Sequence, residues 1–171
     1  MLKPACFLDR DGVINIDRGY VYKKEDFEWV SGAKEAIRYL NKQKYCVFIV
    51  TNQSGISRGL YTEKDVEILH NLINEDLKKE NAFIDEFFYS PYHPDFPDRY
   101  TNLSNLRKPN VGMLEQADKK WKIDKINRFL IGDKEIDLQC AKNFGIDGYI
   151  FKSGNLKKFI ENIKATHNYK L

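Results

Sequence analysis

The stretch Phe7-Leu8-Asp9-Arg10-Asp11-Gly12 decides the fold of this chain. It starts inside the apolar run 5–8, which has the length and composition of a buried strand. Asp9 and Asp11 follow directly, and Gly12 allows the chain to turn. Two carboxylates this close repel each other unless a cation or a proton compensates them, so the pattern indicates either a cation site or a solvated Asp-Gly turn.

Four more apolar runs of strand length lie along the chain, at 45–50, 86–89, 128–131 and 148–151. Helical periodicity between and after the strands predicts helices at 32–43, 62–80, 111–121, 135–144 and 156–163. The stretch 90–110 lacks this pattern and is expected to be a long loop. Strands that alternate with helices pair in parallel through right-handed crossovers. We therefore expect one α/β domain over residues 1–171, with a doubly wound, mainly parallel, Rossmann-like sheet. Ligands of such sheets bind beyond the carboxyl ends of the strands.

The composition excludes several classes of protein. Of the 171 residues, 42% are hydrophobic and 31% are charged, which is ordinary for a folded domain. The net charge of +3 suits an anionic substrate but is too small to indicate nucleic acid. Without a signal sequence or an apolar run near the ~20 residues of a membrane span, we expect a cytoplasmic protein with no membrane partner. Cys6, Cys46 and Cys140 lack a metal-binding spacing and are expected to be buried, reduced thiols.

Three further polar clusters follow the strands and the long loop. The segment 51–54, Thr-Asn-Gln-Ser, offers hydroxyl, amide and backbone donors for phosphate oxygens, although a plain turn has the same composition. Arg107 and Lys108 supply a planar fork and a point charge for a phosphoryl group, although such pairs are common on surfaces. Asp133 and Asp137 suit a hard cation such as Mg²⁺, or simply the first turn of a helix. Because all the clusters lie at the same end of one predicted sheet, we interpret them together as a site for phosphate and metal.

In chain order, these clusters resemble the four motifs of the haloacid dehalogenase superfamily of phosphatases: Asp-x-Asp-Gly, a strand-end Thr, Lys-Pro, and Gly-Asp-x-x-x-Asp. The surrounding sequence is similar to the histidinol-phosphatase-like branch and, within it, to the heptose bisphosphate phosphatases. The likeness runs from Phe7 to about Gly154. It is carried by the segments 8–15, 17–20, 51–56, 58–59, 107–109, 112–114 and 131–134.

The resemblance implies a role for each residue of the site. Asp9 would attack phosphorus and form an aspartyl-phosphate, while Asp11 would protonate the leaving oxygen and then activate the water. Mg²⁺ would bind Asp9, the backbone carbonyl of Asp11, and Asp133. Thr51 and Lys108 would hold the phosphoryl oxygens during transfer.

The resemblance also implies the substrate. The expected reaction removes the 7-phosphate of D-glycero-D-manno-heptose 1,7-bisphosphate, in the biosynthesis of lipopolysaccharide or capsule heptose. Histidinol phosphate and a DNA 3′-phosphate remain alternative substrates, and a phospho-ligand-binding protein is the non-enzymatic alternative. Arg107 would recognise the substrate, and Asp137 would orient neighbouring groups. Substrate contacts are expected at Asp17, Arg18, Gly19, Tyr20, Asn52, Gln53, Ser54, Arg107 and Lys134.

The chain departs from the family pattern in the long loop 90–110. Many relatives carry a structural zinc there, bound by a Cys-x-His pair and a Cys-x-Cys pair. This chain has Ser90-Pro91-Tyr92 and Ser104-Asn105-Leu106 instead, so we expect no zinc. We expect the loop to be held by apolar packing of Tyr92, Phe96, Tyr100 and Leu106.

The remaining expectations concern shape and assembly. No insertion is large enough for a cap domain, because residues 17–30 offer only a short flap, so the site should be open. A monomer is expected, since no exposed apolar helix face stands out. We expect His93 to be a loop residue rather than a catalyst, and we place His70 and His167 on helix surfaces.

Overall fold

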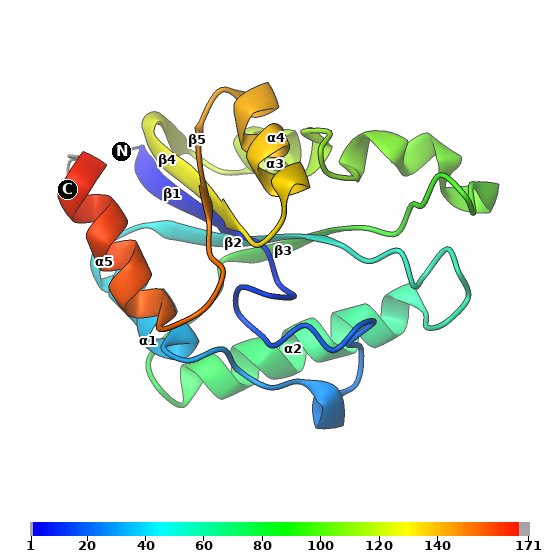
Figure 1. Ribbon diagram of the computed structural model, residues 1–171, viewed down its shortest axis with the longest axis horizontal. Coiled ribbons are helices and arrows are strands. Elements are labelled where there is room, and N and C mark those ends of the chain that lie inside the picture. The colour runs from blue at the N-terminus through cyan, green and yellow to red at the C-terminus, as the bar shows by residue number, and fades with distance from the viewer. Residues whose placement is uncertain (1, 168–171) are drawn as a thin grey trace.

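A sheet of five parallel strands forms the centre of the computed structural model within residues 2–167, the part of the chain that the structure describes (Figure 1). The strands are β1 (Lys3–Leu8), β2 (Cys46–Asn52), β3 (Glu86–Ser90), β4 (Ile123–Gly132) and β5 (Asp147–Ile150). They lie in the order β3-β2-β1-β4-β5, and every neighbouring pair is parallel. This confirms the doubly wound parallel sheet expected from the alternation of strands and helices.

Helices cover both faces of the sheet (Figure 1). The helices α1 (Ala33–Lys42), α2 (Glu63–Lys78) and α5 (Leu156–His167) pack on one face. The helices α3 (Gly112–Lys120) and α4 (Glu135–Phe144) pack on the other. Two-sided coverage explains why the strands are continuously apolar instead of alternating with polar residues.

Alternate residues of β1 point into two separate cores. Cys6 and Leu8 belong to the buried cluster beneath α1, α2 and α5. Ala5 and Phe7 belong to the cluster beneath α3 and α4, which includes Met113. Burial of β1 on both faces holds its carboxyl end in place, and that end carries the first polar cluster of the sequence.

Every predicted strand and helix occurs, but some ends differ from the prediction. The strand β4 begins at Ile123 instead of 128, because Lys3 pairs with Ile123 whereas Ala5 pairs with Arg128. Residues 124–127, which include the exposed Ile126, therefore bulge out of the ladder, and the apolar pattern could not reveal this. The helix α5 continues to His167, beyond the predicted end at 163.

The long loop 90–110 contains the 3-10 helix η2 (Asp98–Leu106). Its apolar residues do not form the single cluster that we expected. Tyr100 is buried against Ile56 and Val66, with Tyr92 packed beside them. Leu106 joins the core beneath α3 and α4, and Phe96 is 38% exposed. The expectation was wrong because the loop runs across the edge of the sheet and divides its apolar side chains between two cores.

The order of the strands determines where a ligand can bind. The chain proceeds outward from β1 through β2 to β3 and then returns to the other side of β1 with β4. The crevice beyond the carboxyl ends of strands at such a reversal is the usual ligand site of open α/β sheets. Asp9 follows β1 and Asp133 follows β4, so both lie at this point. Among the described residues, no helix has the length and apolar character needed to span a membrane.

Candidate active site

A cavity of about 250 Å³ opens at the carboxyl ends of the strands. Most of the side chains that line it are acidic, basic, amide or hydroxyl groups, which suits a small charged ligand. Most of the site residues expected from the sequence meet there. The lining residues are Asp9, Asp11, Asp17, Gly19, Tyr20, Thr51, Asn52, Gln53, Ser54, Tyr61, Lys108, Lys134 and Ile136.

Asp9 stands directly after β1 and is only 7% exposed. Its backbone N–H donates to the carbonyl oxygen of Ile131 at 2.9 Å, which continues the ladder between β1 and β4. Burial raises the pKa of Asp9 to about 7, although Lys108 opposes this shift. The carboxyl group is therefore held rigidly and is poorly solvated, which favours its reaction with an electrophile.

Lys108 provides the positive charge beside Asp9. Its Nζ atom lies 3.0 Å from Asp9 Oδ1 and 2.6 Å from Asp137 Oδ1, and the side chain is buried. Burial alone would lower the pKa of Lys108, but the two carboxylates raise it above its ordinary value. Asn52 holds the lysine in place, because its amide donates to the carbonyl oxygen of Lys108 and accepts from the N–H of the same residue. The lysine thus presents a fixed cation to the cavity.

Asp11 is fixed by neighbours that donate hydrogen bonds to its carboxylate. Nη2 of Arg10 lies 3.1 and 3.0 Å from its two oxygens. Asn15 Nδ2 donates to Oδ1 at 3.0 Å and Gln53 Nε2 donates to Oδ2 at 3.0 Å. Arg10 is fully buried and also donates to the carbonyl oxygen of Val21. Asp11 therefore has a defined orientation at the edge of the cavity.

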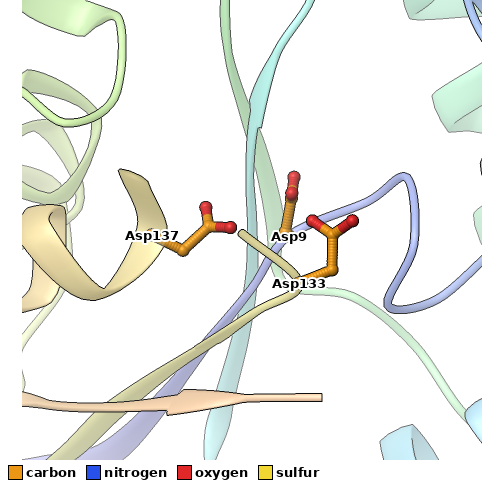
Figure 2. Close-up of side chains that lie close together, drawn as sticks. All are labelled: Asp9, Asp133 and Asp137. Carbon is orange, nitrogen blue, oxygen red and sulfur yellow. The ribbon is translucent and has the colours of Figure 1, made fainter. Parts of the chain in front are cut away.

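Three carboxylates, including that of Asp9, lie close together. Figure 2 shows Asp9 after β1, Asp133 in the turn after β4, and Asp137 in the first turn of α4. One oxygen from each lies within 4.8 Å of the others. Gly12 has φ +88°, and a Cβ atom there would lie only 2.5 Å from Asp133 Oδ2, so the residue must be glycine for Asp133 to approach.

The donor set fits a hard divalent cation such as Mg²⁺. Asp133 Oδ1 is buried and accepts no hydrogen bond from the residues that the structure describes, which leaves a lone pair for a metal. Asp137 is engaged differently, since Oδ1 pairs with Lys108 and Oδ2 accepts the N–H of Lys134 at 3.1 Å. The arrangement agrees with Asp9 and Asp133 as ligands and with Asp137 as an orienting group.

Comparison with known proteins connects this geometry to a family. The polynucleotide kinase 3 phosphatase family model matches residues 7–164. D-glycero-β-D-manno-heptose-1,7-bisphosphate 7-phosphatase from Rhodopseudomonas palustris is 40% identical over 162 residues, covering 94% of this chain and 90% of the relative. The enzyme of the same name from Escherichia coli K12 is 40% identical over 139 residues, covering 81% of this chain and 73% of the relative.

The chain belongs to the heptose-1,7-bisphosphate 7-phosphatase family.

Solved structures agree that this is a phosphatase of the haloacid dehalogenase superfamily. A haloacid dehalogenase-like phosphatase from Mesorhizobium loti superposes with a TM-score of 0.81 at 33% identity, over 87% of this chain and 72% of its own. The D,D-heptose 1,7-bisphosphate phosphatase from B. bronchiseptica, solved with magnesium and phosphate, gives a TM-score of 0.77 at 29% identity, over 92% and 86% of the two chains.

The flap of this phosphatase contributes to the cavity through some of its predicted residues but not through all of them. Asp17, Gly19 and Tyr20 line the cavity, and Asp17 pairs with Lys134 across it at 3.2 Å. Arg18 does not line the cavity, because its guanidinium pairs with Glu28 within the flap. The expected substrate contact at Arg18 therefore stays a prediction.

Arg107 also lies outside the lining of the cavity. Its guanidinium donates to the carbonyl oxygen of Tyr92 at 3.2 Å, and burial and the nearby Arg58 lower its pKa. Arg58 lies over the ring of Phe96 at 4.6 Å and within 3.2 Å of His93 Nε2. Cationic and aromatic side chains thus tie the loop 90–110 to the segment after β2.

The sequence did not predict every buried residue beneath the site. His70, expected on a helix surface, is 5% exposed and stacks on Phe87 at 4.3 Å. Its Nε2 lies 3.4 Å from Nη1 of Arg10. This expectation was wrong because His70 lies one turn from Val66 and Ile73 on the buried face of α2, and only its polar type suggested exposure. The side chain of His167 lies outside the described residues.

Two residues that line the cavity were not predicted at all. Tyr61 and Ile136 line it, although neither belongs to the polar clusters in the sequence. The position of Ile136 beside the acidic cluster could have suggested it. Tyr61 lies beyond Gly59 in a segment with no distinguishing pattern, and only the folded chain brings its hydroxyl group to Gln53.

Proposed function

We propose that this phosphatase removes the 7-phosphate of D-glycero-D-manno-heptose 1,7-bisphosphate through a phosphorylated Asp9. The observation that carries the proposal is the ion pair of buried Lys108 with Asp9, in a cavity that also contains Asp11 and Thr51. The relatives named heptose-1,7-bisphosphate 7-phosphatase, at about 40% identity, support the choice of substrate.

The chain's own residues carry out two displacements. A carboxylate oxygen of Asp9 forms a bond to phosphorus while the bond from phosphorus to the sugar oxygen breaks, and Asp11 gives its proton to that oxygen. A water molecule then attacks phosphorus and gives a proton to Asp11, which releases phosphate and restores Asp9. The hydrogen bonds from Arg10, Asn15 and Gln53 hold Asp11 for both steps.

Lys108 and Thr51 stabilise the transferring group. The ammonium of Lys108 attracts the phosphoryl oxygens and is already in position before the reaction, so it costs little reorganisation. The hydroxyl of Thr51, at the end of β2, accepts a hydrogen bond from Gln53 and keeps its own hydrogen for a phosphoryl oxygen. Electrostatic stabilisation of this kind dominates catalysis of phosphoryl transfer.

Asp9, Asp133 and the backbone carbonyl of Asp11 would hold Mg²⁺. When bound, the cation neutralises the repulsion between the Asp9 carboxylate and a phosphate dianion. The free oxygen of Asp133 supports this assignment. Asp17, Tyr20 and Lys134 lie across the cavity, where they would contact the sugar.

We propose a cytoplasmic monomer that acts in lipopolysaccharide or capsule heptose biosynthesis and needs no zinc. The contacts of Arg58 with Phe96 and His93 support a loop that holds its shape without a metal.

A second candidate is a phosphatase for 3′-phosphates of nucleic acid. The match of residues 7–164 to the polynucleotide kinase 3 phosphatase model favours it. The net charge of +3 speaks against it, since proteins that grip a phosphate backbone rely on a strong basic surface.

A substrate panel tests the proposal. Mg²⁺-dependent phosphate release is measured from both anomers of heptose 1,7-bisphosphate, histidinol phosphate, fructose 1,6-bisphosphate and a 3′-phosphorylated oligonucleotide. We expect kcat/KM for one heptose anomer to exceed the others by at least about 100-fold, or about 2.7 kcal/mol of transition-state discrimination. A preference for histidinol phosphate or the oligonucleotide would overturn the substrate and leave the mechanism standing.

A further inference from the structure

A chain of hydrogen bonds leads from Tyr61 to the acid-base residue. The hydroxyl of Tyr61 donates to Gln53 Oε1 at 2.7 Å. The amide nitrogen of Gln53 then donates to Asp11 Oδ2 at 3.0 Å and to Thr51 Oγ1 at 2.9 Å. Both Tyr61 and Gln53 are buried, so water competes weakly for these bonds.

The hydrogen bonds from Tyr61 through Gln53 to Asp11 have one consistent direction from donor to acceptor. If the amide of Gln53 were reversed, its oxygen would face the carboxylate of Asp11, and two acceptors would repel each other. Burial raises the pKa of Tyr61 to about 12, so its hydroxyl remains a proton donor. The carboxylate of Asp11 therefore sets the orientation of the amide, and the hydroxyl of Tyr61 supplies a donor to the buried Oε1 in that orientation.

The ring of Tyr61 is held from several sides. It stacks on Tyr22 of the flap with the ring centroids 4.9 Å apart, and it packs with Ile56 and Val66. A Cβ atom at Gly55 would lie 2.1 Å from the ring, so glycine at that position leaves the space that Tyr61 occupies. The hydroxyl is thus delivered to Gln53 by a rigid support.

We propose that Tyr61 is a positioning residue, which fixes the amide of Gln53 so that Asp11 is aimed at the leaving oxygen of the substrate. The inference rests on the proposed role of Asp11 as general acid. Tyr61 touches neither metal nor phosphorus in this scheme and acts only through Gln53. Without its hydroxyl, the buried Oε1 of Gln53 loses a donor, so the amide is held less firmly and the donor that it gives to Asp11 is less well placed.

Substrates that differ in their leaving group test this inference. A sugar alkoxide must be protonated as it leaves, whereas p-nitrophenolate leaves without help from an acid. The parameter kcat/KM covers the steps up to the first phosphoryl transfer, in which Asp11 acts as acid. For Tyr61→Phe we expect kcat/KM to fall about 10- to 100-fold with the best alkyl phosphate of the panel. With p-nitrophenyl phosphate it should fall about threefold or less, because loss of acid catalysis alone spares this substrate.

Two further variants make the result decisive. Tyr22→Phe removes a hydroxyl from the stacked ring and leaves the bond between Tyr61 and Gln53, so both substrates should react as with the parent protein. Asp11→Asn sets the pattern for a lost acid, and thermal unfolding verifies that each variant is folded. Equal losses on both substrates in Tyr61→Phe, beside a leaving-group-dependent loss in Asp11→Asn, would overturn the role of Tyr61. A uniform loss in Asp11→Asn would overturn the role of Asp11 and this inference with it.

Discussion

Lys108 Nζ lies 3.0 Å from Asp9 Oδ1, and both side chains are almost completely removed from solvent. A buried ion pair costs desolvation, so its presence at the centre of the site indicates a chemical use rather than a gain in stability. Without the lysine, the carboxylates of Asp9 and Asp137 would lose the cation that pairs with both of them.

Lys108→Met should therefore impair both activity and stability. We expect kcat to fall about 100- to 1,000-fold, as for the loss of one oxyanion donor. The free energy of unfolding should fall by about 3–5 kcal/mol, because two buried carboxylates lose their partner. Steady-state kinetics and urea unfolding measure the two effects. Lys120→Ala, which removes an exposed ion pair with Glu86, is the control and should cost at most about 1 kcal/mol. Near-normal turnover by the Lys108 variant would contradict its assigned role.

Gly12→Ala should disable the metal site. The added methyl group would lie 2.5 Å from Asp133 Oδ2, so the carboxylate must move away. We expect a much higher Mg²⁺ concentration at half-maximal activity, measured by titration. Gly154→Ala is the matched control: its φ is +100° and nothing lies within 4 Å of the added atom, so only the backbone cost of about 1–2 kcal/mol should remain. Equal behaviour of the two variants would show that backbone strain, and not the contact with Asp133, is responsible.

Substitutions of Asp133 and of Asp137 should have different effects on the affinity for Mg²⁺. Asp133→Asn removes a charged ligand and should raise the apparent dissociation constant of Mg²⁺ by at least about tenfold. Asp137→Asn changes a carboxylate that already contacts Lys108 and the N–H of Lys134. We therefore expect kcat to fall, while the apparent dissociation constant of Mg²⁺ stays within about threefold of the parent value. Calorimetric titration gives both constants. A large loss of Mg²⁺ affinity in Asp137→Asn would make it a ligand.

His70 should make the folded chain sensitive to acid. Burial, with Arg10 nearby, lowers the pKa of His70 well below its usual value. Below about pH 6.5, His70 is protonated in the unfolded chain but not in the folded chain. The free energy of unfolding therefore falls as the pH falls, by up to about 1.4 kcal/mol per pH unit. His70→Phe keeps the ring stacked on Phe87 and removes this term. In urea unfolding from pH 7 to pH 5, the free energy of unfolding of the variant should rise relative to that of the parent protein as the pH falls. A constant difference would contradict the prediction.

The loop 90–110 should hold its structure without zinc. After exhaustive chelation, we expect Mg²⁺ alone to restore full activity and metal analysis to find far less than one zinc per chain. Arg58→Ala should lower the melting temperature by a few degrees, since it removes the contacts with Phe96 and His93. Stoichiometric zinc in the purified protein would refute the expectation.

The fold was predictable because each strand is a short apolar run followed by a helical pattern. The polar clusters after these runs also predicted where Asp9, Thr51, Lys108 and Asp133 would converge, since carboxyl ends of parallel strands share one edge. What periodicity cannot reveal is contact between segments without a pattern of their own. Examples are the bulge at 124–127 and the division of Tyr100 and Leu106 between two cores.

The errors at single residues have a common physical origin. Sequence assigns a residue to a surface or a site by its type, whereas folding assigns it by its neighbours. His70 is polar but lies one turn from buried residues of α2. Tyr61 looks like an ordinary loop aromatic until its hydroxyl is seen beside Gln53.

The central position of β1 also bears on how the protein acquires activity during folding. Ala5 pairs with Cys46 on one side and with Arg128 on the other, so the second ladder joins distant parts of the chain. Closing so long a loop costs entropy before any contact rewards it, and pairings of this kind form late. Asp9 and Asp133 come together only when that ladder exists. During refolding, recovery of turnover should therefore lag behind the return of the helical circular-dichroism signal. The activity of the enzyme would then report when the last step of folding is complete.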